Sequence, residues 1–595
     1  MVHPKSIVIL DFGGQYAHLI GNRVRRLGAY SEILPPETSA NDLKNAAGII
    51  LSGGPQSVYD KGSPQADPKI LELGIPVLGL CYGLHWITHT LGGEVKPGAT
   101  KEYGRTLIHI EHGGGAILQD CGKECTVWMS HGDEAAKLPP GFTRIATSDA
   151  CANAAFSDEQ KKIYALQFHP EVTHSEHGSD MLKHFVEVCK PAVWSIDNFE
   201  QKITEEIKKE VGDKSVFMLV SGGVDSSVAF TLLNKVLGTE RVQGLLVDTG
   251  LMRKDEVRLI NEAFKKVGIQ NLHIVDASQE FFANLNNMYD PEEKRKVIGD
   301  TFLAVQKRIS EEMGLDSKKY MLGQGTIYPD TIETGGTKHA DKIKTHHNRV
   351  DAIQKMIDKG LVIEPLKELY KDEVRKLGEE LGLPHELVWR HPFPGPGLGV
   401  RILCAKKEDR NQKAEGSEIA LPHAILPVQS VGVQGDGRTY RHAVALFSSD
   451  PFVVTDKHLE LATTIPNKSR ELNRVLLCLS HTKPFDFSFT SGYLTRERAN
   501  LLRQADAIVH DAMMQAKLYE LIWQFPVVLL PIGEESGKQS IVLRPIASTD
   551  AMTANAFILP PDVLKKMTEK ILKLKDIDAV FLDLTNKPPG TIEWE

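Results

Sequence analysis

The sequence has few cysteines, no long apolar run and no excess of positive charge. Its seven cysteines are odd in number and irregularly spaced, which argues against a disulfide framework and predicts reduced thiols in a cytoplasmic protein. Cys121 and Cys125 lie close together, but no second Cys/His pair has zinc-binding spacing. No apolar stretch approaches the ~18 residues that cross a bilayer, so no membrane partner is expected. The formal net charge of −8 argues against a general nucleic-acid-binding surface.

The chain is too long for a single hydrophobic core. At 595 residues it is expected to form three or four domains. Short apolar strands alternate with helical stretches in its first two thirds, which predicts mostly parallel sheets covered on both faces. We therefore expect an α/β protein with two consecutive doubly wound domains, at 1–190 and 191–400, followed by an α+β region at 401–595.

The most informative stretch is a turn rich in glycine and serine between a strand and a helix. An apolar run at 216–220 predicts the strand, and the residues from Val228 predict the helix. The free N–H groups and the dipole of a helix N-terminus favour phosphate there, and glycine allows close backbone approach. The turn lacks the lysine and the spacing of a Walker loop. A phosphate site is predicted at Ser221, Gly222, Gly223, Val224, Asp225, Ser226 and Ser227.

A cysteine in the first domain has the setting of a nucleophile. Cys81 lies in G-L-C-Y-G at 79–83, after an apolar strand, and this is the thiol counterpart of the G-x-S-x-G nucleophile elbow. A helix N-terminus at such a turn favours the thiolate. Downstream, His169 and Glu171 stand two residues apart in F-H-P-E, so in an extended segment they share a side. Cys81 alone would more often be a buried structural residue, but the two motifs together favour a Cys–His–Glu centre.

Further motifs make the first domain resemble the class I glutamine amidotransferases. They are D-F-G-G-Q at 11–15, L-S-G-G-P at 51–55 and M-S-H-G-D at 129–133. Members of that family release ammonia from glutamine through a thioester. The resemblance implies that Cys81 is the nucleophile, His169 the base and Glu171 its orienter.

The resemblance also implies two donors of an oxyanion hole, and at one position the chain differs from the family pattern. The N–H groups of Gly54 and Tyr82 would stabilise the oxygen anion, since they belong to the matching segments. The family usually has glutamine four residues after the nucleophile, whereas this chain has His85. We therefore expect this position to affect how the protein binds glutamine or how that binding is regulated.

The second domain carries polar residues after several of its strands. The stretch at 221–227 resembles the pyrophosphate loop of the N-type ATP pyrophosphatases, which cleave ATP between its α and β phosphates. Val247 lies at the end of the next strand, and Gln324 and Asp330 follow a later one. Because ligands bind beyond the carboxyl ends of strands in open α/β sheets, Val247 and Gln324 are expected to contact ATP. Asp225 and Asp330 are expected to hold Mg²⁺ on the pyrophosphate.

The third region contains the same order of elements twice. Each copy, at about 401–500 and about 501–595, predicts two strands, a helix and a third strand that leads into Lys-Pro. The first copy has the turn G-D-G-R at 435–438, and the second has the tail K-P-P-G-T-I-E-W-E at 587–595. The pattern predicts two β-β-α-β repeats with complementary signatures, and we expect them to share one sheet.

These motifs in this order make the whole chain resemble the glutamine-hydrolysing GMP synthetases. The likeness extends from residue 6 to the tail and includes G-Q-G-T-x-Y-P-D, T-H-H-N and H-P-F-P-G-P-G. Short members resemble a version with one copy that dimerises, so this chain is expected to be a monomer with an internal pseudo-dimer. At the turn of the second copy, either Lys538 or Gln539 can take the position that contacts XMP. The resemblance implies that XMP is bound by Arg295, Asp436, Gln539, Lys587 and Glu593.

The implied activity is that of a ligase with three small-molecule substrates, ATP, XMP and glutamine. It would form GMP, AMP, pyrophosphate and glutamate through an adenyl-XMP intermediate. Two alternatives remain open at this point. One is another glutaminase-coupled ATP pyrophosphatase such as NAD synthetase, whose usual glutaminase lacks the Cys–His–Glu elbow. The other is a nucleotide-sensing regulator with a silent glutaminase, for which His85 leaves room.

Overall fold

The computed structural model describes most of the chain. The described residues are 3–14, 16–172, 174–315, 319–333, 359–406, 419–433, 438–469, 471–548 and 554–595. The chain divides into two compact units. The first comprises Met1–Glu210, Thr326–Gly360 and Glu364–Val374, and the second comprises Val211–Gly325, Leu361–Ile363 and Arg375–Glu595.

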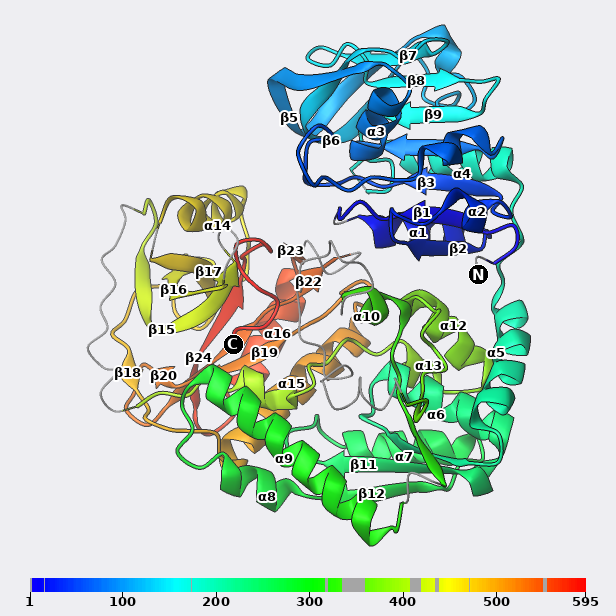
Figure 1. Ribbon diagram of the computed structural model, residues 1–595. Coiled ribbons are helices and arrows are strands. Elements are labelled where there is room, and N and C mark those ends of the chain that lie inside the picture. Colours follow the sequence, from blue (N-terminus) through cyan, green and yellow to red (C-terminus); the bar gives the residue numbers. More distant parts are fainter. Residues whose placement is uncertain are drawn as a thin grey trace. The chain divides into compact units, whose positions relative to one another are not determined.

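A mixed sheet forms the centre of the first unit (Figure 1). Within the described residues it has nine strands, in the order β2-β1-β3-β4-β9-β8-β7-β5-β6. Neighbours from β2 to β9 are parallel, and the pairs beyond β9 are antiparallel. The strands are β1 Ile7–Leu10, β2 Ser31–Leu34, β3 Gly48–Leu51, β4 Val77–Leu80, β5 Glu94–Ile110, β6 Glu124–Lys137, β7 Thr143–Ser148, β8 Ala155–Asp158 and β9 Ile163–Leu166.

Short apolar strands in this sheet are buried along their whole length. Strands β1, β3 and β4 are buried at every position, as expected where other elements cover both faces of a parallel sheet. Among its described residues, the helices of the unit are α1 Ala17–Arg26, α2 Ala40–Leu43, α3 Tyr82–Thr90, α4 Gly178–Cys189 and α10 Tyr328–Glu333, with 3₁₀ turns η1 Pro68–Glu72 and η2 His112–Gly114. Helices α5 Ile196–Val211 and α12 Lys371–Glu380 each run across a boundary between the units.

The second unit begins with a parallel sheet. In the described part of the chain its order is β12-β11-β10-β13-β14, and neighbouring strands are parallel. Its strands are β10 Ser215–Leu219, β11 Val242–Asp248, β12 Leu272–Asp276, β13 Tyr320–Gly323 and β14 Val362–Ile363. Its helices are α6 Val224–Leu237, α7 Glu256–Lys266, α8 Ser278–Asn284, α9 Pro291–Glu312 and α13 His385–Val388, with η3 Thr239–Arg241 and η5 Gly397–Arg401.

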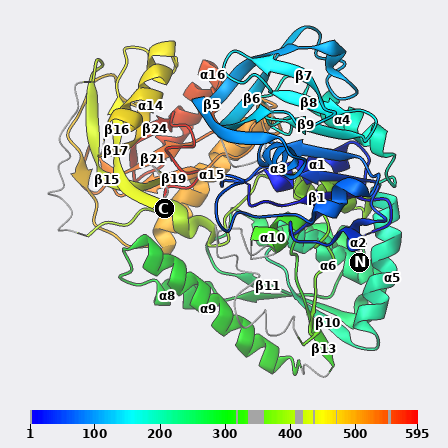
Figure 2. The ribbon, with the colours of Figure 1, turned by 45° about the horizontal axis from the view of Figure 1, so that its top comes forward.

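The two C-terminal copies share one sheet, in the order β15-β16-β17-β24-β21-β19. Its centre is the antiparallel pair β17–β24, which lie side by side in yellow and red in Figures 1 and 2. On both sides of this pair the next strand is parallel and the outer one antiparallel. The elements are β15 His423–Val433, β16 Arg438–Leu446, α14 Asp456–Lys468, β17 Leu472–Cys478, α15 Arg496–Gln515, β19 Val527–Leu530, β21 Gln539–Leu543, α16 Pro561–Ile571 and β24 Ile577–Asp583. Two small ribbons are added by β18 Ser488–Phe489 with β20 Ile532–Gly533 and by β22 Ile546–Ala547 with β23 Asn555–Ala556.

Neighbouring residues of the central strands face opposite sides of this sheet. Val475 and Leu477 belong to a core that includes residues of α14, α15 and α16, whereas Leu476 and Cys478 belong to the core on the other face. Successive side chains of a strand point to opposite faces. The unbroken apolar run of β17 is therefore what a sheet with two covered faces requires.

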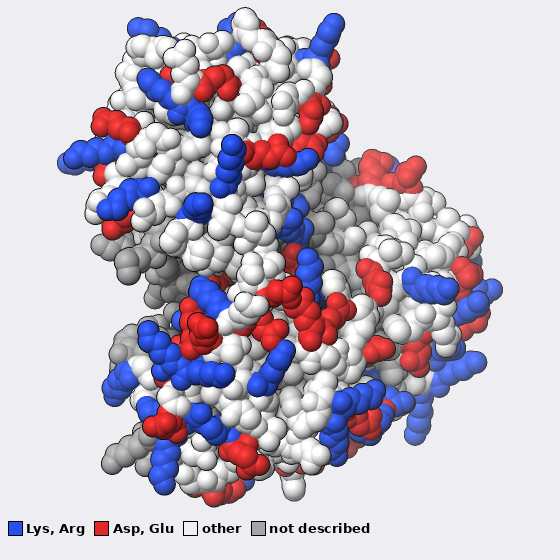
Figure 3. Space-filling view, turned by 90° about the vertical axis from the view of Figure 1, so that its right-hand side faces the viewer, with Lys and Arg blue, Asp and Glu red and all other residues white. Residues whose placement is uncertain are grey.

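The predicted fold class is confirmed, including the two β-β-α-β repeats and their shared sheet. The domain boundaries near 190 and 400 stay a prediction. Among the described residues, no helix combines the length and the apolar character that a membrane crossing demands. Basic and acidic side chains intermingle on the face shown in Figure 3.

Candidate active sites

Cys81 stands at the turn between β4 and α3. Its backbone φ is 50°, and it is the N-cap residue of α3. The glycines on both sides leave no room for a side chain. A Cβ on Gly83 would collide with the carbonyl oxygen of Leu51, and one on Gly79 would lie 2.7 Å from the Gly83 carbonyl group. The turn therefore presents the thiol at a helix N-terminus, where the helix dipole favours an anion.

The structure brings His169 and Glu171 to this thiol. His169 Nδ1 lies 2.7 Å from Glu171 Oε1, and both side chains are buried. A Cβ on Gly53 would lie 3.1 Å from His169 Cε1 and 3.7 Å from Cys81 Cβ. The imidazole ring and the Cys81 side chain therefore both pack against this glycine. Burial opposes protonation of His169, but the Glu171 carboxylate and the Cys81 sulfur outweigh it and raise its pKa to about 10.

The two candidate oxyanion donors lie next to each other. A Cβ on Gly54 would lie 3.2 Å from Tyr82 Cγ and 2.8 Å from the Phe12 carbonyl oxygen. Tyr82 is the first residue of α3, so its N–H belongs to the first turn, which has no intrahelical acceptors. Its side chain is anchored, because the hydroxyl donates to the Pro64 carbonyl at 2.7 Å. The arrangement suits stabilisation of an oxygen anion beside Cys81.

Gln167 is a polar neighbour of Cys81 that was not predicted from the sequence. Its Nε2 lies 4.0 Å from Cys81 Sγ, and its Oε1 lies 2.9 Å from His85 Nε2. Because an amide oxygen only accepts, His85 donates through Nε2. Burial lowers the pKa of His85 to about 4, so the ring is neutral at physiological pH. His85 therefore holds the Gln167 amide toward the nucleophile. Gln167 lies two residues before His169, and this spacing is the sequence signal that could have identified it as a site residue.

We predict that Glu171→Gln lowers the pKa of His169, because it removes the charge that best offsets burial there. An NMR titration of the His169 ring in the whole chain checks this, with a wild-type pKa of about 10 and a lower value in the variant. The folded-state pKa lies above the ordinary ~6.5. The pair therefore stabilises the fold below pH ~6.5, and this contribution is lost as pH rises through the folded-state pKa. An unchanged titration in the variant would contradict the ion pair.

The predicted phosphate loop joins β10 to α6. Gly222 has a φ of 76°, and a Cβ there would collide with Ile260 Cδ1. Gly223 is the N-cap of α6, and Ser221 Oγ lies 3.0 Å from Ser226 Oγ, which fixes the turn. The first N–H groups of α6 have no intrahelical acceptors. The loop therefore has the geometry that binds phosphate at a helix N-terminus.

Two buried oxygens near this loop suit a polar ligand. Ser227 Oγ and Gln324 Oε1 have no hydrogen-bond partner within the described part of the chain. A Cβ on Gly325 would lie 2.8 Å from Ser226 N, so the segment after β13 packs directly on the start of α6. Val247 lies near the end of β11, which neighbours β10. Buried polar groups normally have a partner, so these atoms fit the predicted nucleotide.

The two aspartates predicted to hold Mg²⁺ belong to different units. Asp225 lies in the first turn of α6, and Asp330 lies in α10, where its carboxylate accepts from Ile327 N at 3.1 Å. Their pairing stays a prediction. The donors at the loop, a carboxylate and serine hydroxyls, are oxygen ligands of the kind that Mg²⁺ prefers.

Glu593 in the C-terminal tail is held by two side chains that were not predicted. Arg401 is buried and contacts both carboxylate oxygens of Glu593, at 2.9 and 2.8 Å. Gln524 Nε2 donates to the same carboxylate at 3.2 Å. Gln539 instead accepts from Arg498 Nε at 2.7 Å. The glutamine that reaches Glu593 is therefore Gln524.

Helix α9 holds the end of the tail. Lys294 Nζ forms an ion pair with Glu595 and donates to the Ile402 carbonyl at 2.8 Å. Arg295 donates to the main-chain oxygen of Glu595. Lys587 is fixed at the other end of the tail, where its N–H donates to the Ala554 carbonyl at 2.7 Å. Asp436, the remaining predicted XMP residue, lies outside the described residues.

The tail of the second copy pairs with a strand of the first. Val431 N donates to the Trp594 carbonyl at 2.9 Å, and Thr591 Oγ1 donates to the Val431 carbonyl at 2.9 Å. Gly432 and Gly590 form an isolated antiparallel bridge. The tail of the second copy is therefore a neighbour of β15, the strand that precedes the turn of the first copy.

A buried carboxylate links the central strands to this tail. Asp583 Oδ2 lies 3.0 Å from Arg474 Nη1, 2.8 Å from Arg544 Nη1 and 3.0 Å from Trp594 Nε1. Both guanidinium groups also donate to the Thr591 carbonyl, at 3.1 and 2.8 Å. Burial favours the neutral form of Asp583, but the two guanidinium groups outweigh it and lower its pKa.

We predict that Asp583→Asn destabilises the fold by about 3–5 kcal/mol, because it leaves two buried guanidinium groups uncompensated. Urea unfolding measures the difference, and the exposed Asp576→Asn serves as a control with an expected change below about 0.5 kcal/mol. The folded-state pKa is depressed, so this stabilisation is present above pH ~4 and is lost as pH falls through the folded-state pKa. Equal unfolding midpoints of the two variants would contradict the role of Asp583.

Three family models match separate parts of the chain. The model described as glutamine amidotransferase class-I matches residues 8–189, the one described as NAD synthase matches 195–313, and the one described as GMP synthase C terminal domain matches 511–594. A probable GMP synthase (glutamine-hydrolyzing) of Leptospira interrogans is 49% identical and covers 100% of both chains. The GMP synthases of Bacillus licheniformis and Streptomyces avermitilis are 39% and 38% identical, covering 99% and 100% of this chain and 99% and 98% of their own.

The chain belongs to the glutamine-hydrolysing GMP synthase family. Its membership confirms the predicted family and the prediction of an amidotransferase ligase. The NAD synthetase alternative has less support, because the NAD synthase model matches residues 195–313, whereas the GMP synthases match the full length. The roles of the individual site residues stay predictions.

Proposed function

We propose that this GMP synthase family member makes GMP from XMP, ATP, glutamine and water, and releases AMP, pyrophosphate and glutamate. The observation that carries the proposal is the presence, in one chain, of a buried Cys–His–Glu centre and a helix-terminal phosphate loop. Likeness to named GMP synthases over the full length supports the pairing of these two chemistries. Use of Mg²⁺, a cytoplasmic location and a monomeric state are part of the proposal.

Ammonia is released at Cys81. His169, whose pKa is raised to about 10, holds the proton of the Cys81 thiol, and Sγ attacks the carboxamide carbon of glutamine. The N–H groups of Gly54 and Tyr82 stabilise the oxygen anion. When the C–N bond breaks, His169 gives a proton to the leaving nitrogen, so ammonia departs and a thioester remains. Water attacks the thioester with His169 as base, and glutamate leaves as the thiol is restored. Glu171 orients the ring throughout.

XMP is activated at the phosphate loop. Residues 221–227 hold the departing phosphates while the C2 oxygen of the XMP base attacks the α-phosphorus of ATP and the bond to pyrophosphate breaks. Ammonia then attacks C2, and AMP leaves with that oxygen. Asp225 and Asp330 would hold Mg²⁺, which supplies positive charge against the phosphates when bound. The protein positions the groups and excludes water, because the adenylate and the thioester both hydrolyse.

XMP binds at the C-terminal tail. Arg295 and Lys587 suit its phosphate, and the carboxylates of Asp436 and Glu593 suit sugar hydroxyls or a base N–H. Gln539 stays part of the predicted XMP set, and Gln524 is added to that set because it contacts Glu593. Each copy supplies one of the two signatures, so we infer one nucleotide site per chain.

We predict that Cys81→Ala abolishes GMP formation with glutamine and retains it with ammonium, because the nucleotide site does not need the thiol. The whole chain is assayed with XMP, Mg·ATP and either nitrogen donor, and GMP, AMP and pyrophosphate are measured. Cys189→Ala, which removes another buried cysteine of the first unit, is the matched control and should use both donors. Equal loss with both donors would contradict two separate sites, and formation of ADP and phosphate would overturn the reaction.

A further inference from the structure

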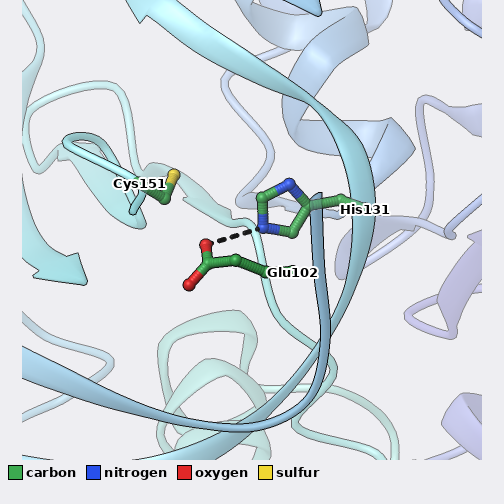
Figure 4. Close-up of side chains that lie close together, drawn as sticks. All are labelled: Glu102, His131 and Cys151. Atoms are coloured by element: carbon green, nitrogen blue, oxygen red, sulfur yellow. Dashed lines mark hydrogen bonds and ion pairs between the residues drawn. The ribbon is translucent and has the colours of Figure 1, made fainter. Parts of the chain in front are cut away.

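Three potential metal ligands converge in the first unit. Glu102 lies on β5, His131 on β6 and Cys151 in the loop after β7. Figure 4 shows the three side chains close together. One ligand atom from each lies within 4.8 Å of the other two. His131 and Cys151 are buried, and Glu102 is 9% exposed. Glu102 and His131 are directly opposite each other in the β5–β6 register, so their side chains share a face.

His131 is oriented as a metal-binding histidine. Its Nδ1 lies 3.0 Å from the Asp133 carbonyl oxygen, which only accepts, so Nδ1 carries the proton. In a neutral ring Nε2 then presents a lone pair, yet it lies 3.2 Å from Glu102 Oε2. Two acceptors at this distance need a positive charge between them, from a proton or a cation. Donation of the other ring N–H to a carbonyl is the usual outer contact of a metal-bound histidine.

Ser148 fixes the other two ligands. Its hydroxyl lies 3.0 and 3.2 Å from the Glu102 carboxylate oxygens, and it accepts from the Cys151 N–H at 2.9 Å. One side chain therefore sets the position of the carboxylate relative to the cysteine. Such outer contacts hold metal ligands in place before the ion arrives.

We propose that Glu102, His131 and Cys151 bind a divalent cation of the zinc class, with water as fourth ligand. Sulfur and imidazole ligands favour zinc-like ions over Mg²⁺ or Ca²⁺. Three protein ligands plus water is a common zinc arrangement. Binding displaces the Cys151 thiol proton and the proton held between His131 Nε2 and Glu102, and both leave to solvent.

The site adjoins the proposed glutaminase. Cys81 Sγ lies 3.6 Å from the Ser130 carbonyl oxygen, and Ser130 immediately precedes His131. A cation bound between His131 and Glu102 therefore lies beside the backbone that contacts the nucleophile. This step rests on the proposed function: occupation of the site slows GMP formation with glutamine and leaves the rate with ammonium unchanged.

Cobalt binding tests the site without any activity measurement. The whole chain carrying Cys81→Ala, which removes the competing active-site thiol, is stripped with a chelator and titrated with Co²⁺. We expect one equivalent, a thiolate-to-cobalt charge-transfer band and the visible bands of four-coordinate cobalt, all displaced by Zn²⁺. Adding Cys151→Ser should remove the charge-transfer band, Glu102→Gln should weaken binding at least about tenfold, and Cys189→Ala should change neither.

Two results would overturn the site: absence of these bands, or identical bands after Cys151→Ser. Glu102→Gln keeps the test decisive if Cys151→Ser fails to fold, since it preserves shape. In the wild-type chain Zn²⁺ should inhibit the use of glutamine, and Cys151→Ser should remove this inhibition. Cobalt binding without inhibition would overturn only the effect on Cys81. Failure to make GMP from either donor would overturn the proposed function, while the cobalt bands would still report on the site.

Discussion

The antiparallel pairing of β17 with β24 is the constraint on which the C-terminal region depends. It joins the last strands of two copies at the centre of one sheet. Asp583 on β24 forms ion pairs with Arg474 on β17 and with Arg544. Both guanidinium groups also donate hydrogen bonds to the Thr591 carbonyl in the tail. The tail in turn pairs with β15 of the other copy. One chain thus places the tail of the second copy beside the strand that precedes the turn of the first copy.

Both proposed chemistries use the same local device, a strand that passes through a glycine-containing turn into a helix N-terminus. In the first unit the turn carries a thiol, and a side chain at Gly83 would collide with Leu51. In the second unit the turn leads into the first N–H groups of α6, which have no intrahelical acceptors, and a side chain at Gly222 would collide with Ile260. The chemistry differs because the first site needs one nucleophilic atom, whereas the second needs several donors around a leaving pyrophosphate.

Local signals predicted most of the fold. Apolar runs and turns located the strands of both copies, because strand burial and turn chemistry depend on neighbouring residues. The missed site residues have distant partners: Gln167 and His85 are 82 residues apart, Arg401 and Glu593 192 apart, and Gln524 and Glu593 69 apart. Gln539 also has a distant partner, Arg498, 41 residues away, so the sequence alone did not decide between Lys538 and Gln539. Glu102 and His131, 29 residues apart, meet only through the β5–β6 pairing.

Sedimentation equilibrium at micromolar concentration tests most directly whether one chain completes its own nucleotide site. If the β17–β24 pair replaces a dimer interface, the measured mass is that of one chain, 65.9 kDa, with and without XMP. A mass of about twice this value would show that the internal pairing does not replace association between chains, and would contradict the account.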